Sequence, residues 1–114
     1  MSLSSYQLGR QSEDWVVQHL EQAGWHILAR NFRGRRGEID VVARQGAVVV
    51  FVEIKSSQHK PPLEALQARQ IGRVRAAAQE FLQKARVSLE SEMRFDVFRV
   101  WGHPVQWEHL QDAF

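Results

Sequence analysis

Apolar residues recur at two different spacings along this chain, and the spacing predicts where helices and strands lie. Residues 6–23 carry apolar side chains three and four positions apart, which predicts a helix that ends at Gly24. Residues 25–32 then predict a short strand, followed by a basic turn between Gly34 and Gly37. The buried stripe of the helix comprises Val16, Val17, Leu20 and Ala23.

A hairpin is the clearest strand signal in the sequence. Two runs rich in β-branched residues, Glu38–Arg44 and Ala47–Lys55, lie on either side of Gln45 and Gly46. Such runs around a turn that contains glycine are typical of a β-hairpin. The second run is apolar at successive positions, as expected for a strand that is covered on both faces.

The second half of the chain predicts one more helix and one more strand. Pro61 and Pro62 interrupt the chain, and a helix is predicted from about Leu63 to Lys84. Arg94–Trp101 predicts a strand, Gly102–Pro104 a turn, and the remainder is too short for a prediction. The apolar face of this helix comprises Val74, Ala77, Ala78 and Phe81.

The predicted order is helix, three strands, helix, strand. This order indicates an α/β domain in which a mixed sheet is flanked by helices. A chain of 114 residues suits one domain with one core, and no repeat or long linker divides it. We therefore expect a single domain over residues 1–114.

The predicted hairpin gathers charged residues on one face of the sheet. With Gln45 and Gly46 as the turn, Asp40 lies opposite Phe51 and Glu38 lies opposite Glu53. Because side chains alternate between faces, Glu38, Asp40, Glu53 and Lys55 then share a face. Facing acids destabilise a sheet, and a divalent cation such as Mg²⁺ would compensate for them. The alternative is a solvated ion-pair cluster with Lys55 as the counter-charge.

Glu13 lies near the middle of the apolar stripe of the first helix. A carboxylate at the centre of a buried stripe needs a cation, a metal or hydrogen bonds. Gly9, one turn earlier, would allow a close approach of the backbone. Two alternatives are a first-turn glutamate favoured by the helix dipole and a glutamate paired with an arginine.

Composition excludes several classes of protein. The chain is 44% hydrophobic and 25% charged, with a net charge of +2, which is typical of a globular protein. No membrane span or secretory signal is visible, and no cysteine is present, so we expect a cytoplasmic protein. The five histidines lack the spacing of zinc ligands. The four tryptophans could stack on bases, although packing within the protein is the simpler interpretation.

Short motifs along nearly the whole chain resemble the YraN-like family of bacterial proteins. The central pair of motifs is Gly37-Glu-Ile-Asp40 followed by Phe51-Val-Glu-Ile-Lys55. The remaining motifs are Gly9-Arg-Gln-Ser-Glu13, Ala29-Arg-Asn-Phe32, Ala76-Ala-Ala-Gln-Glu-Phe-Leu82 and Arg94-Phe-Asp-Val97.

That family is similar to the restriction-endonuclease-like superfamily, whose signature is an Asp, a variable gap and Glu-x-Lys. The resemblance implies the core order helix, three strands, helix, strand, and it implies that Asp40, Glu53 and Lys55 form a nuclease site. Archaeal-type Holliday junction resolvases also carry a glutamate on the first helix, which Glu13 matches. The chain departs from the family pattern at Ser12, Ser57 and Gln70; family members commonly carry a lysine at the last of these positions.

The resemblance implies a Mg²⁺- or Mn²⁺-dependent nuclease that acts on nucleic acid, most simply DNA. In that hypothesis Asp40 and Glu53 bind the metal together with the Ile54 carbonyl, and Glu13 is an outer or second-metal ligand. Lys55 orients the attacking water. Supporting roles are assigned to Glu38 and Gln70, and phosphate contacts to Arg35, Arg36, Arg69 and Arg73.

Two rivals stay open: a nucleic-acid-binding or protein-interaction module without catalysis, and a structural protein with a salt-bridged hairpin. Intact acids favour the enzyme, because pure binding of nucleic acid is better served by removing negative charge. Two cuts on a duplex or a junction would favour a homodimer.

Overall fold

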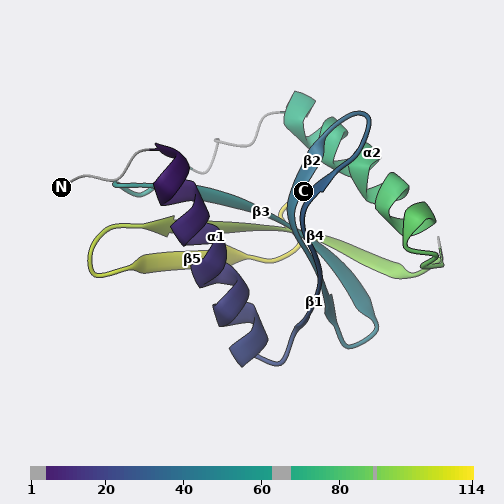
Figure 1. The fold of residues 1–114 in the computed structure, drawn as a ribbon, viewed down its shortest axis with the longest axis horizontal. Helices are drawn as coiled ribbons and strands as arrows, with labels where there is room; N and C mark the ends of the chain where they lie inside the picture. Colours follow the sequence, from purple (N-terminus) through teal and green to yellow (C-terminus); the bar gives the residue numbers. More distant parts are fainter. Residues whose placement is uncertain (1–4, 63–67, 89) are drawn as a thin grey trace.

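The computed structural model describes residues 5–62, 68–88 and 90–114, and these residues form a sheet between two helices (Figure 1). The elements are α1 (Ser5–Gln22), β1 (His26–Arg33), β2 (Glu38–Gln45), β3 (Val48–Ser57), α2 (Ala68–Lys84), β4 (Glu92–Trp101) and β5 (Gln106–Leu110). Neither helix of the described residues is long and apolar enough to cross a membrane.

The sheet is mixed, and its strands follow the order of the sequence from β1 to β5. Strands β3 and β4 are parallel neighbours, and the other neighbouring pairs are antiparallel. A parallel pair needs a long connection, and α2 lies within it. The α/β fold with a mixed sheet is therefore confirmed, with helices and strands in the restriction-endonuclease-like order and β5 added at the edge.

Strand β3 is covered on both faces, as its apolar sequence predicts. Val50 and Val52 pack with α1, whereas Val49 and Phe51 pack with α2. This alternation follows from the two-residue period of a strand. The two apolar clusters place α1 and α2 on opposite faces of the sheet (Figure 1).

The ends of α1 and α2 follow one hydrogen-bonding pattern. After α1 the chain turns at Gly24 (φ 90°), and the Trp25 N–H donates to the Leu20 carbonyl. After α2 the left-handed residue is Arg86 (φ 56°), and the Val87 N–H donates to the Leu82 carbonyl. Both are Schellman ends, which satisfy helix carbonyls and direct the chain back to the sheet.

Three sequence predictions need correction or extension. The hairpin turns at Gly46 and Ala47, not at Gln45 and Gly46, because Gln45 pairs with Val48. Gly46 adopts a positive φ of 59°, which suits the first position of a tight hairpin turn. The C-terminal remainder, for which no prediction was made, forms β5. The predicted start of the second helix, residues 63–67, lies outside the described residues.

Buried charges tie β4 to its neighbours. Asp96, which is fully buried, accepts hydrogen bonds from Arg94, from the His109 ring and from the Asp112 N–H. Arg99 donates to the Pro61 carbonyl at 2.7 Å and pairs with Glu108 at 2.7 Å. Arg99 therefore links β5 to the connection between β3 and α2.

Gly37 allows the start of β2 to lie directly against α2. A Cβ atom at this position would lie 2.9 Å from both the Arg73 carbonyl oxygen and the Arg73 Cβ. The main-chain atoms of a packed helix cannot move without a cost in free energy. Any residue larger than glycine at this position must therefore displace α2. The Gly34 N–H also donates to the Gly37 carbonyl at 2.8 Å, which closes the turn before β2.

We expect Gly37→Ala to lower the free energy of unfolding by about 1–3 kcal/mol, because the added methyl group overpacks the contact with α2. Gly72→Ala is the matched control, since a Cβ at Gly72 meets no atom within 4 Å. This control should gain about 0.5–1 kcal/mol as a glycine-to-alanine change within a helix. Urea denaturation measures both, and an unchanged midpoint for Gly37→Ala would contradict the close-approach argument.

Candidate functional site

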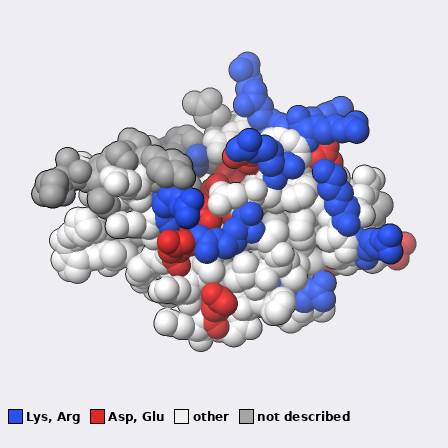
Figure 2. All heavy atoms as spheres, viewed as in Figure 1, with Lys and Arg blue, Asp and Glu red and all other residues white. Residues whose placement is uncertain are grey.

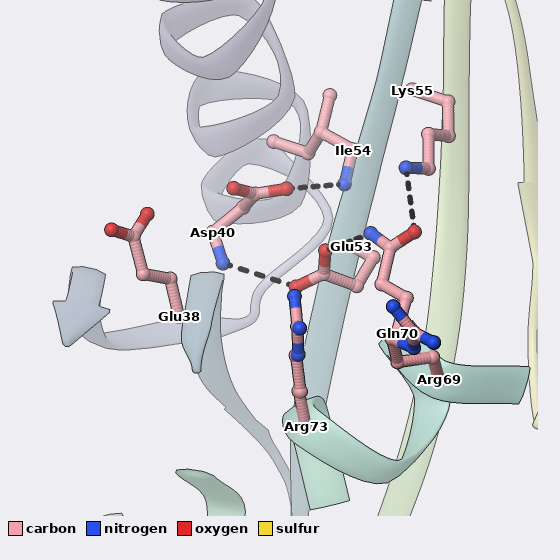
Figure 3. A pocket seen from close by; sticks show the side chains of 8 residues that line it. All are labelled: Glu38, Asp40, Glu53, Ile54, Lys55, Arg69, Gln70 and Arg73. Carbon is pink, nitrogen blue, oxygen red and sulfur yellow. Dashed lines mark hydrogen bonds between the residues drawn. The ribbon is translucent and has the colours of Figure 1, made fainter. Parts of the chain in front are cut away.

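The candidate site begins where the pairing between β2 and β3 ends. The last paired residues are Val41 on β2 and Val52 on β3. The residues that follow them at this end are Asp40 on β2 and Glu53 on β3. The Asp40 N–H donates to Glu53 Oε1 at 3.4 Å, and the Ile54 N–H donates to Asp40 Oδ2 at 2.8 Å (Figure 3). Carboxylates thus accept the main-chain N–H groups that a neighbouring strand would otherwise satisfy.

The observed register corrects the predicted pairing. Glu38 was predicted opposite Glu53, but the turn one residue later shifts the ladder by two, and Asp40 lies beside Glu53 instead. A shift of two residues preserves the face on which each side chain lies. One side of the hairpin was predicted to carry Glu38, Asp40, Glu53 and Lys55. In agreement with this prediction, the four residues line a single cavity.

That cavity has a volume of about 600 Å³ and combines acids with bases. Its acids come from β2 and β3, and its arginines come from the first turns of α2 (Figure 3). In the space-filling view, acidic atoms lie in a hollow with basic side chains around it (Figure 2). The lining residues are Glu38, Asp40, Glu53, Ile54, Lys55, Arg69, Gln70 and Arg73.

Desolvation disfavours the ionised form of the Asp40 and Glu53 carboxyl groups. Desolvation, followed by the charge of Asp40, raises the pKa of Glu53 to about 8. Desolvation also raises the pKa of Asp40; the Ile54 N–H opposes this rise, and the charge of Glu13 adds to it. Two adjacent buried carboxylates cannot both stay charged cheaply without a cation, so this pair retains a proton near neutral pH.

Gln70 connects the acid pair to Lys55. Its amide nitrogen donates to Glu53 Oε2 at 3.4 Å, and its amide oxygen accepts from Lys55 Nζ at 3.3 Å (Figure 3). The amide therefore orients a carboxyl group and an ammonium group from one position on α2. The charge of Lys55 also lowers the pKa of both Asp40 and Glu53, against the larger effect of burial.

Glu13 lies close to the site but is engaged by β1. Its Oε1 accepts from Arg30 Nε and from Asn31 Nδ2, each at 2.9 Å, and Arg30 also pairs with Asp14. Pairing with an arginine was one of the alternatives for this glutamate, and it is the one observed. Glu13 does not line the cavity, although its charge raises the pKa of Asp40.

The four arginines predicted to hold phosphates divide into two pairs. Arg69 and Arg73 line the cavity. Arg35 and Arg36 are exposed on the turn before β2, and this turn contacts α2 through an Arg35 N–H that donates to Glu80 at 2.8 Å. Both pairs therefore belong to the part of the molecule formed by α2 and the turn beside it.

Sequence reasoning missed Arg30 and Asn31 as the residues that hold Glu13. Asn31 adopts a positive φ of 52°, and asparagine tolerates this conformation better than most residues. The motif Ala29-Arg-Asn-Phe32 contained the signal, but a single sequence does not show which of its side chains points towards α1. Among the described residues, no group of three or more His, Cys, Asp or Glu side chains is arranged to hold a metal ion.

Comparison with known proteins identifies the family of the chain. Residues 12–100 match the model of UPF0102, which is described as an uncharacterised protein family. The chain belongs to the UPF0102 family. The predicted membership of the YraN-like family is thereby confirmed.

Relatives of similar length occur in several bacteria. A UPF0102 protein of Geobacter metallireducens is 41% identical over 100% of this chain and 97% of its own. A UPF0102 protein of Ruegeria pomeroyi is 45% identical over 93% and 86%, and one of a Shewanella species is 43% identical over 94% and 98%. These names record membership of the family and no activity.

We expect the stability of the protein to fall as pH rises from about 5 to about 8 in buffer with EDTA. The folded state keeps a proton on Glu53, whose pKa is about 8, and the unfolded chain releases it near the ordinary value of 4.5. Between these values the folded state binds more protons, so unfolding becomes easier as pH rises, by about 1.4 kcal/mol per pKa unit of difference at most.

Glu53→Gln should remove most of this pH dependence and should be more stable than the parent at pH 9, because a neutral amide replaces the buried charge. Glu21→Gln, at an exposed position of α1, should keep the parent's slope. Urea denaturation at a series of pH values measures the slope. A parent protein whose stability rises over this range would refute the raised pKa.

Proposed function

We propose that this member of UPF0102 is a divalent-metal-dependent nuclease that hydrolyses phosphodiester bonds of nucleic acid. The observation that carries the proposal is the adjacent pair of half-buried Asp40 and buried Glu53, which lies beside Lys55 in a cavity lined by Arg69 and Arg73. A site with acids at its floor and arginines at its rim suits a cation below and a phosphate above.

The donor set fits a hard divalent cation such as Mg²⁺ or Mn²⁺. Two carboxylates are adjacent and desolvated, and the neighbouring Ile54 offers a main-chain carbonyl. The raised pKa of Glu53 indicates that the pair lacks sufficient positive charge from the protein alone. When bound, such an ion would polarise the phosphate and make a water molecule more acidic.

Asp40 and Glu53 would hold the ion, and their main-chain hydrogen bonds restrict where their oxygens lie. Glu13 and Glu38 supply further negative charge near Asp40, as the raised pKa of Asp40 indicates. Glu38 lines the cavity and Glu13 does not, and both would have an outer role, in which each would accept hydrogen bonds from coordinated waters.

Lys55 and Gln70 would position the water and balance charge. Lys55 lines the cavity, and the Gln70 amide links its ammonium group to Glu53. A fixed ammonium stabilises the negative charge that develops on the phosphate in the transition state. Gln70 is neutral, so the charge of Lys55 is not opposed by a second ammonium at the position where the resemblance implies a lysine.

Arg69 and Arg73 would hold the phosphates that flank the bond, and Arg35 and Arg36 would extend this contact along the turn before β2. Such contacts are independent of sequence and weaken with salt. DNA is our proposed substrate, including branched DNA, because of the similarity to junction resolvases. Two coordinated cuts would require two copies of the chain.

Binding without cleavage is the second candidate function, and one observation favours it. The described residues bring two carboxylates together, not the three-member group that would hold a metal ion most firmly. Isothermal titration with Mn²⁺ distinguishes the candidates. A nuclease should bind Mn²⁺ and lose this binding in Asp40→Asn, whereas a binding module has no need of the ion.

We expect Mg²⁺ or Mn²⁺ to support cleavage of labelled DNA, and Asp40→Asn or Lys55→Ala to lower the rate at least a hundredfold. Asp40→Asn keeps the size of the side chain, so circular dichroism should show a folded protein. The substrates are single-stranded, duplex, flapped and four-way-junction DNA, with RNA for comparison. Undiminished cutting by purified Asp40→Asn would defeat the assignment of the site.

Arg73→Ala should reduce the dependence of binding on salt. Loss of one phosphate contact lowers the slope of log K against log salt concentration by about 0.9 on duplex DNA. Arg75→Ala is the matched control, because Arg75 is exposed on the same helix but does not line the cavity. Fluorescence anisotropy at several salt concentrations measures both slopes, and equal slopes for the two variants would contradict the proposed contact.

A further inference from the structure

Three of the four tryptophans are left without a role by the proposed nuclease site. Trp25 is buried in the core, which is the simpler interpretation of its sequence position. Trp15 and Trp101 instead line a second cavity. Trp107 is 46% exposed, and its ring centroid lies 6.2 Å from that of Trp15. These three tryptophans therefore lie outside the acidic cavity.

The second cavity is small and has walls of mixed chemistry. It has a volume of about 130 Å³ and lies between the first turns of α1 and the last residues of β3 and β4. Its apolar lining residues include Leu8, Trp15, Val100, Trp101 and Val105. Its hydrogen-bonding groups include Gln11, Ser12, Ser57 and Gln58.

We propose that this cavity binds one unpaired base of a single-stranded nucleic acid. A base has two apolar π faces and an edge of hydrogen-bond donors and acceptors, and proteins receive unstacked bases between aromatic faces and polar side chains. The indoles of Trp15 and Trp101 supply aromatic surface. The amides of Gln11 and Gln58 can both donate and accept, so they suit the edge of any base.

The size and chemistry of the cavity argue against other occupants. Pockets for drug-sized molecules have volumes of about 300–1,000 Å³, so this cavity suits a group no larger than a single ring system. A purely apolar occupant, such as a side chain from a protein partner, would make no hydrogen bond with the amides of Gln11 and Gln58 that line the cavity. A duplex offers no free base to enter the cavity.

Strand β3 contributes residues to both cavities. Lys55 lines the acidic cavity, and Ser57, two residues further on, lines the second cavity. Two residues of a strand span roughly 7 Å, which is about two steps of a stacked nucleic-acid strand. A strand with its scissile phosphate at the acid pair would therefore present a nearby base to the second cavity. In this respect the inference rests on the proposed function.

A basic side chain, Lys60, lies beside Trp101 and suits the phosphate backbone of the same nucleic-acid strand. The Lys60 ammonium lies 5.4 Å from the centroid of the Trp101 ring, and its 3.8 Å pairing with Glu108 is loose. Its side chain is 56% exposed. An ammonium above an indole that stacks with a base would be positioned to contact the adjoining phosphate.

The test measures binding without cleavage, using the full chain with Asp40→Asn in EDTA. The probes are a fluorescein-labelled twelve-residue oligodeoxythymidylate, the same backbone without bases, and oligouridylate. We expect the abasic strand to bind at least about tenfold more weakly than the thymidylate, because base–aromatic contacts are lost while phosphates stay. Comparison with oligouridylate shows whether the base comes from DNA or RNA. Equal affinity for the thymidylate and the abasic strand would overturn the proposal.

A pair of variants locates the effect. Gln11→Phe places a ring in the cavity from an exposed helix position, and it should abolish the preference for the thymidylate over the abasic strand. Gln18→Phe is the matched control, because Gln18 is exposed two turns later on α1 and does not line the cavity. A base preference that survives Gln11→Phe, or that Gln18→Phe removes equally, would overturn the assignment to this cavity.

Failure of this inference is distinguishable from failure of the proposed function. Metal-dependent cleavage by the parent, together with indifference to bases in the binding test, would refute the base pocket and keep the nuclease. A base preference that Gln11→Phe removes, in a protein that cleaves no substrate with Mg²⁺ or Mn²⁺, would support the pocket and refute the nuclease.

Discussion

The rest of the structure depends on the burial of β3 between α1 and α2. This strand is apolar on both faces up to Val52, and Glu53 is the first charged residue after that run. Because the strand continues along the same protein interior, Glu53 is only 5% exposed although it lines the cavity. The raised pKa of this carboxyl group is therefore a consequence of the fold and not of one unusual contact.

The geometry of the site follows from how closely other elements approach β3. Gly37 allows α2 to touch the start of β2, which carries Arg73 over the acids, and Arg99 holds the connection that leads into α2 at Pro61. On the other side, Arg30 and Asn31 hold Glu13 at the border of the site. Residues outside the cavity thus determine which charges face Asp40 and how far each charge lies from it.

The two cavities divide the chemistry of a nucleic-acid strand between the two helices. Charged groups from β2, β3 and α2 suit phosphates, whereas indoles and amides near α1 suit a base. Both cavities include residues from the last part of β3, so a shift of this strand would move them together. An arrangement of this kind would select a strand with an unpaired base near the bond that is cut.

The sequence by itself determined the order of the elements from α1 to β4, the double burial of β3 and the face shared by Asp40, Glu53 and Lys55. These features depend on residue type and on a period of two, which a register shift of two residues does not change. Tertiary structure alone decided that Asp40 lies beside Glu53, since the turn begins at Gly46 with a positive φ. It also decided that arginine holds Glu13 and that two tryptophans share a cavity, because those contacts join segments that are distant in the sequence.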